Sequence, residues 1–345
     1  MPLARTIPIK NLYYLFLYAW DRFPEGSSID VGSDESPELP NLLARVLFGG
    51  VNRLLRRGID RGYQCREEEL RSPRGTMLIG NSISNGSFAR RGLTCSIDEL
   101  TEDVPHNRII KATCRTLAAH KDISPDLAPG LNSLTLRFSK VANVPLNRRL
   151  FRTLQLSRNS GHYGMIMKVC ELVLDALQPD EESGKSRFAS ILEDEERMSR
   201  IFEAFVLNFF KHEQNKYQAR AEHIDWDVLP NSLDLHFLPI MKTDVTLRSQ
   251  SKIIILDAKF YKDMYQRSQG GRPKVRSGHL YQILSYLNNF EPLSGIEKEG
   301  VLLYPAVDEP EITYDYQIGG RRIRVMSVDL GSPWKQIRER VLQIC

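Results

Sequence analysis

The chain has 345 residues and a mass of 39.6 kDa, which exceeds the size of one ordinary hydrophobic core and predicts two domains. Its composition, 41% hydrophobic and 26% charged, excludes wholesale disorder, and no apolar run or signal core suggests a membrane segment, so a cytoplasmic protein is expected. The net charge of +4 permits a polyanionic partner, while scattered cysteines without a CxxC pair indicate neither a zinc knuckle nor a disulfide framework.

The N-terminal half combines helices with a region of short strands. The segment Ile7–Arg22 is rich in aromatic residues and is predicted to be helical from about Asn11, because Asn can cap a helix. A second helix is predicted to begin near Leu42 and to end at about Arg57. The glycines of residues 59–104 favour small strands and turns, and Asn107–Ala119 is predicted to be helical again.

The charge pattern changes near the middle of the chain. No Asp or Glu occurs from Leu127 to Cys170, although Lys and Arg recur throughout that stretch. Such a stretch can follow a phosphate backbone or form a solvated face, and both interpretations stay open. The order of elements becomes more regular beyond residues 155–165, which predicts an α+β domain at residues 1–160 and a second domain at residues 161–345.

The C-terminal part alternates between helices and strands. Apolar residues recur at three- and four-residue intervals after Glu195, which predicts a long buried helix. A later helix is predicted over His279–Asn289. The predicted strands are Ser232–Phe237, Met241–Arg248, Ile253–Lys259 and Gly300–Tyr304. This order predicts an α/β domain with a mixed sheet that is flanked by helices.

Two acidic residues and a lysine are brought together by this order. Asp257 and Lys259 are two residues apart on one predicted strand, so their side chains leave the same sheet face. Asp244 lies 13 residues upstream, a separation that allows a hairpin-like return beside Asp257. The two carboxylates, with the backbone carbonyl of Ala258, can hold Mg²⁺, which prefers oxygen ligands and keeps several waters. Lys259 would orient or deprotonate a water that attacks a phosphodiester.

An Asp-x-Lys pair on a strand is by itself more often a surface ion pair. Here both charges stand at the end of an apolar strand, where an unpaired charge is costly, and this favours a site. Glu203, between two phenylalanines of the earlier helix, is a further catalytic candidate that needs a partner such as the metal or its water. Gln282 and Tyr286 lie four apart on the later helix, where they either contact DNA phosphate and support Lys259 or simply pack.

Other catalytic motifs are missing from the sequence. The histidines form no HxxH or HExxH pair, and no GxSxG or GxxxxGK[ST] occurs, so neither a zinc hydrolase, a common serine hydrolase nor a P-loop is predicted. Acidic residues and a lysine on neighbouring strands after an acidic helix are typical of metal-dependent nucleases of the PD-(D/E)xK kind.

Five segments resemble one known family almost from end to end. They are IPIKNLYYLFLYAW at 7–20, NRIIKAT at 107–113, KTDVTLRSQSKIIILDAKFYK at 242–262, LYQILSYL at 280–287 and LLYP at 302–305. In these segments the chain resembles McrC, the nuclease subunit of McrBC restriction systems that act on modified cytosine. The resemblance implies metal-binding acids at Asp244 and Asp257 and a catalytic lysine at Lys259, and all three are present.

The resemblance also implies partners. It implies Mg²⁺-dependent cutting of double-stranded DNA that carries modified cytosine, by a subunit docked on a ring of McrB, an AAA+ GTPase that binds the GTP and reads the base. Residues 1–160 would engage and stimulate that ring. One alternative is a regulatory subunit that mainly activates the partner GTPase, with cleavage secondary or lost, and another is a stand-alone housekeeping nuclease. Mn²⁺ would suit the same oxygen ligands.

Overall fold

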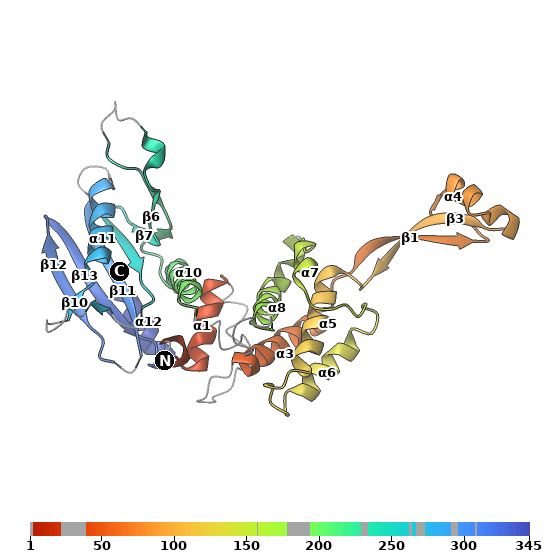
Figure 1. Ribbon diagram of the computed structural model, residues 1–345, viewed down its shortest axis with the longest axis horizontal. Coiled ribbons are helices and arrows are strands. Elements are labelled where there is room, and N and C mark those ends of the chain that lie inside the picture. The colour runs from red at the N-terminus through yellow and green to blue at the C-terminus, as the bar shows by residue number, and fades with distance from the viewer. Residues whose placement is uncertain are drawn as a thin grey trace. The chain divides into compact units, whose positions relative to one another are not determined.

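The computed structural model describes residues 3–21, 39–156, 158–177, 194–228, 234–261, 264–266, 273–290, 296–307 and 309–345. The chain forms two compact units (Figure 1). We name them the sheet unit, which comprises Met1–Leu42 and Ala176–Cys345, and the arm unit, which comprises Leu43–Asp175. No helix of the described segments is long and apolar enough to cross a membrane.

The sheet unit is built on a mixed sheet with the strand order β12-β13-β11-β8-β7-β4. Its strands are β4 (Gln218–Arg220), β7 (Val245–Arg248), β8 (Lys252–Ala258), β11 (Glu297–Ala306), β12 (Thr313–Ile318) and β13 (Arg321–Asp329). The neighbours β8, β11 and β13 run parallel, and the remaining pairs are antiparallel. The apolar run of β8 is buried because both of its neighbours are strands and both sheet faces are covered. The predicted mixed sheet is confirmed.

Helices cover both faces of this sheet. On one face lies α11 (Ser277–Asn289), and a Cβ at Gly300 of β11 would stand 2.7 Å from Ile283 of that helix, so glycine permits the close packing. On the other face lies α10 (Glu195–Glu213), which begins after Asp194, whose side chain accepts a hydrogen bond from the backbone N–H of Arg197. The helices α1 (Ile9–Ala19) and α12 (Trp334–Leu342) pack beside α10 through aromatic rings that meet Phe205 edge to face.

The first helix is held by the C-terminal end of the chain. It begins at Ile9 and not near Asn11, so the predicted cap is wrong. The side-chain amide of Asn11 instead donates hydrogen bonds to the carbonyls of Leu330, at 2.8 Å, and Ser332, at 2.9 Å. These contacts join the start of the chain to the sheet unit, so the compact units differ in extent from the predicted domains 1–160 and 161–345.

The arm unit combines helices with an antiparallel hairpin that projects from them (Figure 1). Its helices are most of α3 (Leu39–Arg57), α5 (Pro105–Ala118), α6 (Ala128–Arg137), α7 (Arg148–Arg152) and most of α8 (Gly164–Leu177). Its strands and small helices are β1 (Gly62–Leu70), β2 (Thr76–Met77), α4 (Ile79–Ser84), η2 (Ser87–Arg90), β3 (Leu93–Thr101) and η3 (Arg158–Tyr163). The predicted short strands and the following helix are confirmed.

Two predicted strands of the sheet unit differ from the structure. Within Ser232–Phe237, residues 232 and 233 lie outside the described segments, and a 3₁₀ turn, η4 (Leu235–Phe237), follows a left-handed Asp234 with φ of 57°. Met241–Arg248 is broken into β6 (Met241–Lys242) and β7. The remaining short elements are η1 (Leu3–Arg5), β5 (His223–Ile224), β9 (Tyr265–Gln266) and β10 (Lys274–Val275).

Basic side chains of the arm unit remain exposed. Arg149 and Arg152 of α7 face solvent, and Arg148 lies 3.7 Å from the carboxylate of Asp175. Exposure agrees both with a phosphate-binding surface and with a solvated face.

Candidate active site

The break between β6 and β7 places Asp244 beside Asp257. Val245 pairs with Leu256 across the antiparallel hairpin, so the residue before Val245 stands next to the residue after Leu256. The backbone N–H of Ala258 donates a hydrogen bond of 2.8 Å to Oδ2 of Asp244 and fixes this arrangement. The hairpin-like return expected from the sequence is therefore present.

Asp257 and Lys259 meet at the C-terminal end of β8. The Asp257 side chain is completely buried, and Nζ of Lys259 lies 2.9 Å from its Oδ2. This contact is an ion pair, and among the described residues neither carboxylate oxygen of Asp257 has a partner with good hydrogen-bond geometry. Because a buried carboxylate normally has partners for its lone pairs, Asp257 retains acceptor capacity for a further ligand.

The acidic side chains at this site outnumber the basic ones. Burial raises the pKa of Asp244 to about 7, and the negative charges of Asp257 and Glu203 act in the same direction. Burial also raises the pKa of Asp257, although Lys259 opposes it. Burial alone would lower the pKa of Lys259, but Asp257 and Asp244 outweigh burial and raise it. A lysine ammonium is thus held beside two carboxylates that repel each other.

Glu203 of α10 faces the same site. Burial raises its pKa, while Lys259 lowers it and Asp257 raises it further, so the three groups share one electrostatic environment. The hydroxyl of Ser199 donates a hydrogen bond of 3.2 Å to Oε1 of Glu203. The sequence predicted that Glu203 needs a polar partner. Ser199 of the same helix supplies one such contact.

The pair on α11 lies on the opposite side of the site. Nε2 of Gln282 donates a hydrogen bond of 2.8 Å to the hydroxyl of Tyr286. Burial raises the pKa of Tyr286, and the charges of Asp257 and Asp244 add to the effect. Tyr286 therefore adjoins the acids and also packs in the core beneath α11, whereas Gln282 contacts Tyr286.

Two neighbours of the site were not singled out from the sequence. Nδ1 of His279 lies 2.7 Å from the hydroxyl of Tyr304, and burial, together with Lys259 and Arg276, lowers the pKa of His279 to about 4. Burial raises the pKa of Tyr304, and the charge of Asp257 adds to it. The strand register would have identified Tyr304, because it stands two residues after Leu302, which pairs with Asp257.

The oxygen donors suit a hard divalent cation. Among the described residues, no three His, Cys, Asp or Glu side chains gather closely enough to hold a metal ion by themselves. Asp244, Asp257 and the carbonyl of Ala258 offer a partial set of oxygen ligands, and such a set suits a cation that keeps several waters. The unsatisfied oxygens of Asp257 and the raised pKa of both aspartates are what a bound cation would relieve.

Comparisons with known proteins give the family. The model described as McrBC 5-methylcytosine restriction system component matches residues 9–305. The chain belongs to the McrBC family. It is 31% identical over 341 residues to the type IV methyl-directed restriction enzyme EcoKMcrBC of Escherichia coli strain K12, and the match covers 98% of this chain and 97% of that protein.

A solved structure of the family agrees with the fold. In a half-complex from the tetradecameric assembly of Thermococcus gammatolerans McrB AAA+ hexamers with bound McrC, one chain matches with a TM-score of 0.55 and 16% identity. The match covers 97% of this chain and 77% of that chain. At this identity the likeness establishes the fold alone.

Proposed function

We propose that this McrBC-family chain is the DNA endonuclease subunit of a GTP-dependent restriction complex, with a PD-(D/E)xK site that uses Mg²⁺. The observation that carries the proposal is the buried Asp257–Lys259 ion pair beside Asp244 at the end of β8. When bound, Mg²⁺ would lower the pKa of a coordinated water and neutralise charge on the phosphate.

Each side chain has a role that its surroundings support. Asp244, Asp257 and the carbonyl of Ala258 would hold the cation, since the two aspartates stand side by side at the end of β8. Because its pKa is raised, Lys259 stays protonated. Its ammonium orients the attacking water and stabilises negative charge on the phosphate. Glu203 would accept a hydrogen bond from a water at the site, and Gln282 would contact phosphate or support Lys259 through Tyr286.

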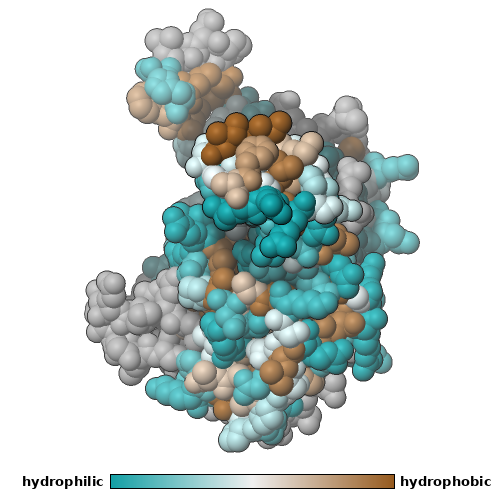
Figure 2. All heavy atoms as spheres, turned by 90° about the vertical axis from the view of Figure 1, so that its right-hand side faces the viewer, coloured by the Kyte–Doolittle hydropathy of each residue, from teal (hydrophilic) through white to brown (hydrophobic). Residues whose placement is uncertain are grey.

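The arm unit is proposed to engage an AAA+ GTPase ring that binds the GTP and reads the modified cytosine. In the archaeal assembly named above, McrC is bound to McrB AAA+ hexamers. At the end of the hairpin of this chain, several apolar side chains are more than half exposed, namely Met77, Ile79, Ile83 and Phe88. Figure 2, in which this end faces the viewer, shows hydrophobic side chains gathered there. Clustered exposed apolar side chains are typical of a protein-binding surface.

Plasmid cleavage tests the nuclease directly. The wild type and Asp257→Asn are incubated with Mg²⁺, methylated plasmid, the partner ring and GTP, with Asp225→Asn as a matched control because Asp225 is exposed in the same unit. We expect cleavage by the wild type and Asp225→Asn only when partner and GTP are present, and none by Asp257→Asn. Cutting by Asp257→Asn at the wild-type rate would refute the site.

The same assay separates the alternative functions. GTP hydrolysis by the partner should rise equally with wild type and Asp257→Asn, because the acidic site lies in the sheet unit. If GTP turnover rises but no protein cuts DNA, the chain is a regulatory subunit. Efficient cutting without partner or GTP would instead identify a stand-alone nuclease.

A further inference from the structure

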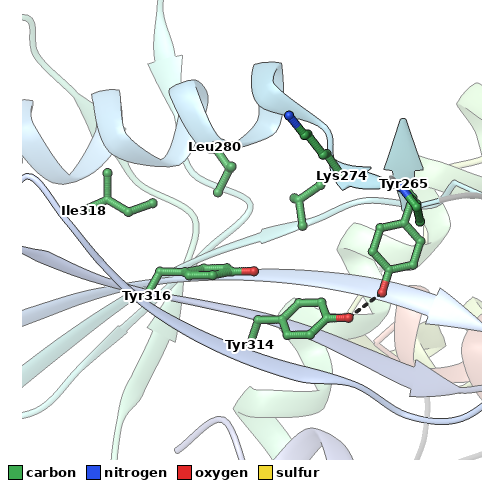
Figure 3. A pocket seen from close by; sticks show the side chains of 8 residues that line it. Tyr265, Lys274, Leu280, Tyr314, Tyr316 and Ile318 are labelled. Atoms are coloured by element: carbon green, nitrogen blue, oxygen red, sulfur yellow. Dashed lines mark hydrogen bonds between the residues drawn. The ribbon is translucent and has the colours of Figure 1, made fainter. Parts of the chain in front are cut away.

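A pocket of about 480 Å³ opens between α11 and the edge strand β12 of the sheet unit (Figure 3). Tyr314, Tyr316 and Ile318 alternate along β12 and line its floor, while Leu280 of α11 faces them. Tyr265 and Lys274, from β9 and β10, line another side. The pocket exists because α11 packs mainly over β8 and β11, which leaves the edge strand partly uncovered.

The tyrosines present ring faces to the pocket. The hydroxyls of Tyr265 and Tyr314 lie 2.7 Å apart in a mutual hydrogen bond, so their polar ends are already satisfied. Burial raises the pKa of Tyr265 to about 12, and the bond to Tyr314 adds to this, so Tyr265 stays neutral at physiological pH. Figure 3 shows the Tyr316 ring edge-on, with Leu280 across the pocket from it. The Tyr316 side chain is 38% exposed, which leaves its ring accessible to a ligand.

The charge of the lining restricts the ligand further. Among the described residues that line the pocket, Lys274 is the one charged side chain, although the negative charge of Glu309 also acts on Tyr265. A planar group therefore finds aromatic and aliphatic surfaces, and Lys274 adds a positive charge to the lining. The volume also falls within the range of about 300–1,000 Å³ that small-molecule pockets occupy.

The pocket shares a sheet face with the acidic site. Ile253 and Ile255 of β8 pack under α11, and Asp257 continues the same alternation, so it leaves the sheet on the side of α11. Leu280 precedes Gln282 by two positions on α11, and the core beneath this helix lies between the pocket and Asp257.

We propose that this pocket binds a nucleobase that carries a phosphate, with the base stacked on Tyr316 and the phosphate near Lys274. Aromatic side chains bind bases of any sequence by stacking, because every base has a planar face. Two sources share this chemistry, an unpaired base of the DNA and a free nucleotide. Binding of a DNA base rests on the proposed nuclease function, whereas binding of a free nucleotide does not.

Fluorescence of a base analogue tests the proposal without cleavage. The full-length protein is titrated, in metal-free buffer, into an oligonucleotide that carries an unpaired 2-aminopurine, whose emission is quenched by stacking. We expect quenching by the wild type and by Tyr316→Phe, which keeps the ring, and about 10-fold weaker binding by Tyr316→Ala. Tyr281→Ala is the matched control, since this tyrosine is 70% exposed on α11 outside the pocket.

Competition with guanosine monophosphate then identifies the source. Quenching that persists in excess nucleotide assigns the pocket to a DNA base, and displacement of the analogue assigns it to a free nucleotide. Equal binding by Tyr316→Ala and wild type, or an equal loss in Tyr316→Phe and Tyr316→Ala, overturns the proposal. Because the buffer contains no metal, this result does not depend on the nuclease being active.

Discussion

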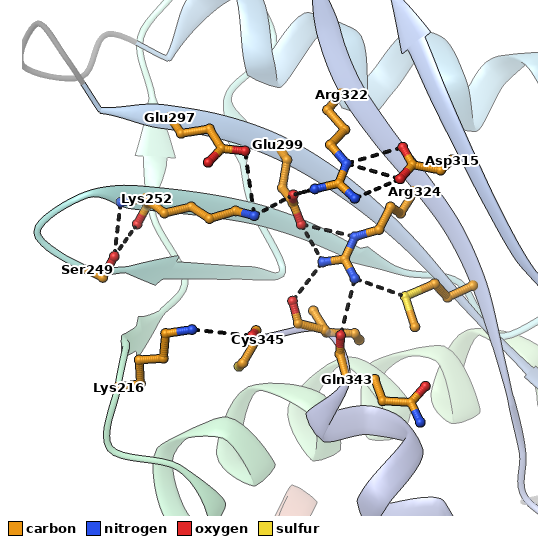
Figure 4. Close-up of polar contacts among 12 residues, drawn as sticks. Lys216, Ser249, Lys252, Glu297, Glu299, Asp315, Arg322, Arg324, Gln343 and Cys345 are labelled. Carbon is orange, nitrogen blue, oxygen red and sulfur yellow. Dashed lines mark hydrogen bonds and ion pairs between the residues drawn. The ribbon is translucent and has the colours of Figure 1, made fainter.

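The sheet contains two completely buried carboxylates, Asp257 on β8 and Glu299 on β11, and their surroundings are opposite. Glu299 is surrounded by cations: Nζ of Lys252 lies at 2.7 Å, Nη1 of Arg322 at 3.2 Å, and Arg324 forms a further ion pair (Figure 4). Asp257 has one ammonium and two neighbouring acids, and its oxygens accept no hydrogen bond.

The difference separates a structural acid from a candidate catalytic one. The arginines around Glu299 have further partners. Arg322 also forms an ion pair with Asp315, and Arg324 donates hydrogen bonds to the carbonyls of Gln343 and Ile344. Such a saturated network joins four strands to the C-terminal helix segment and has no place for another ligand. A deficit of partners around a buried acid, as at Asp257, is what a binding site requires.

The largest expected effect is on catalysis and compares two lysines of the same strand region. Lys259→Met removes the ammonium at the acidic site, and cleavage should fall by about 10²–10⁴-fold. Lys252→Met removes an ammonium from Glu299, which keeps two arginines, and cleavage should stay near the wild-type rate at low temperature. Initial rates of plasmid cleavage with partner and GTP measure both. Equal losses in the two variants would show that the comparison does not separate function from structure.

The next largest effect is a loss of stability. Glu299→Gln removes the negative charge that three buried or half-buried cations share, and the free energy of unfolding should fall by about 3 kcal/mol. Urea denaturation followed by circular dichroism measures this change. Asp315→Asn is the control, because Asp315 is an exposed member of the same network and its loss should cost less than about 1 kcal/mol.

Asp244→Asn should instead raise the free energy of unfolding, and this effect should depend on pH. The pKa of Asp244 is about 7 in the folded protein and 3.8 for the ordinary side chain, so the folded state binds its proton more tightly. The resulting stabilisation is present below about pH 4 and is lost as the pH rises through about 7.

The metal-free variant should therefore be more stable than the wild type by about 1–3 kcal/mol near pH 8, and the difference should vanish near pH 4. Thermal melts across this pH range measure it. Addition of Mg²⁺ should stabilise the wild type more than the variant, because the variant lacks one carboxylate ligand. A variant that is less stable than the wild type at every pH would show that Asp244 is not under charge repulsion.

The smallest effect is expected on α11. Tyr286→Phe removes the hydroxyl that accepts from Gln282 but keeps the ring in the core, so stability should change by less than about 1 kcal/mol. If Gln282 acts through Tyr286, the cleavage rate should fall by a modest factor of about 2–10 and Gln282→Ala should match it. Unequal rates for the two variants would separate Gln282 from Tyr286.

The acidic site could be predicted because its determinants are local. The apolar run of β8 marks a buried strand, the spacing of Asp257 and Lys259 sets a common face, and a short separation places Asp244 in the same hairpin. The sheet followed from similar apolar patterns. The weak alternation of Ser232–Phe237, by contrast, predicted a strand wrongly, since the left-handed Asp234 starts a turn there.

The features that sequence reasoning missed depend on distant partners. Asn11 looked like a helix cap, but its hydrogen-bond acceptors lie more than 300 positions away, at Leu330 and Ser332. Tyr304 joins the site only through the parallel register of β11 with β8. Glu299 sits among charged residues that indicate a surface, and only the sheet order reveals that cations of two other strands converge on it.

The contact of Asn11 with the C-terminal segment has a consequence for protein synthesis. The arm unit, Leu43–Asp175, is inserted in the chain between the two parts of the sheet unit. It leaves the ribosome before the second part of the sheet unit and can fold while α1 still lacks α10, α12 and the carbonyls that its asparagine binds. A nascent chain that ends before α10 would therefore contain the arm unit without the acidic site.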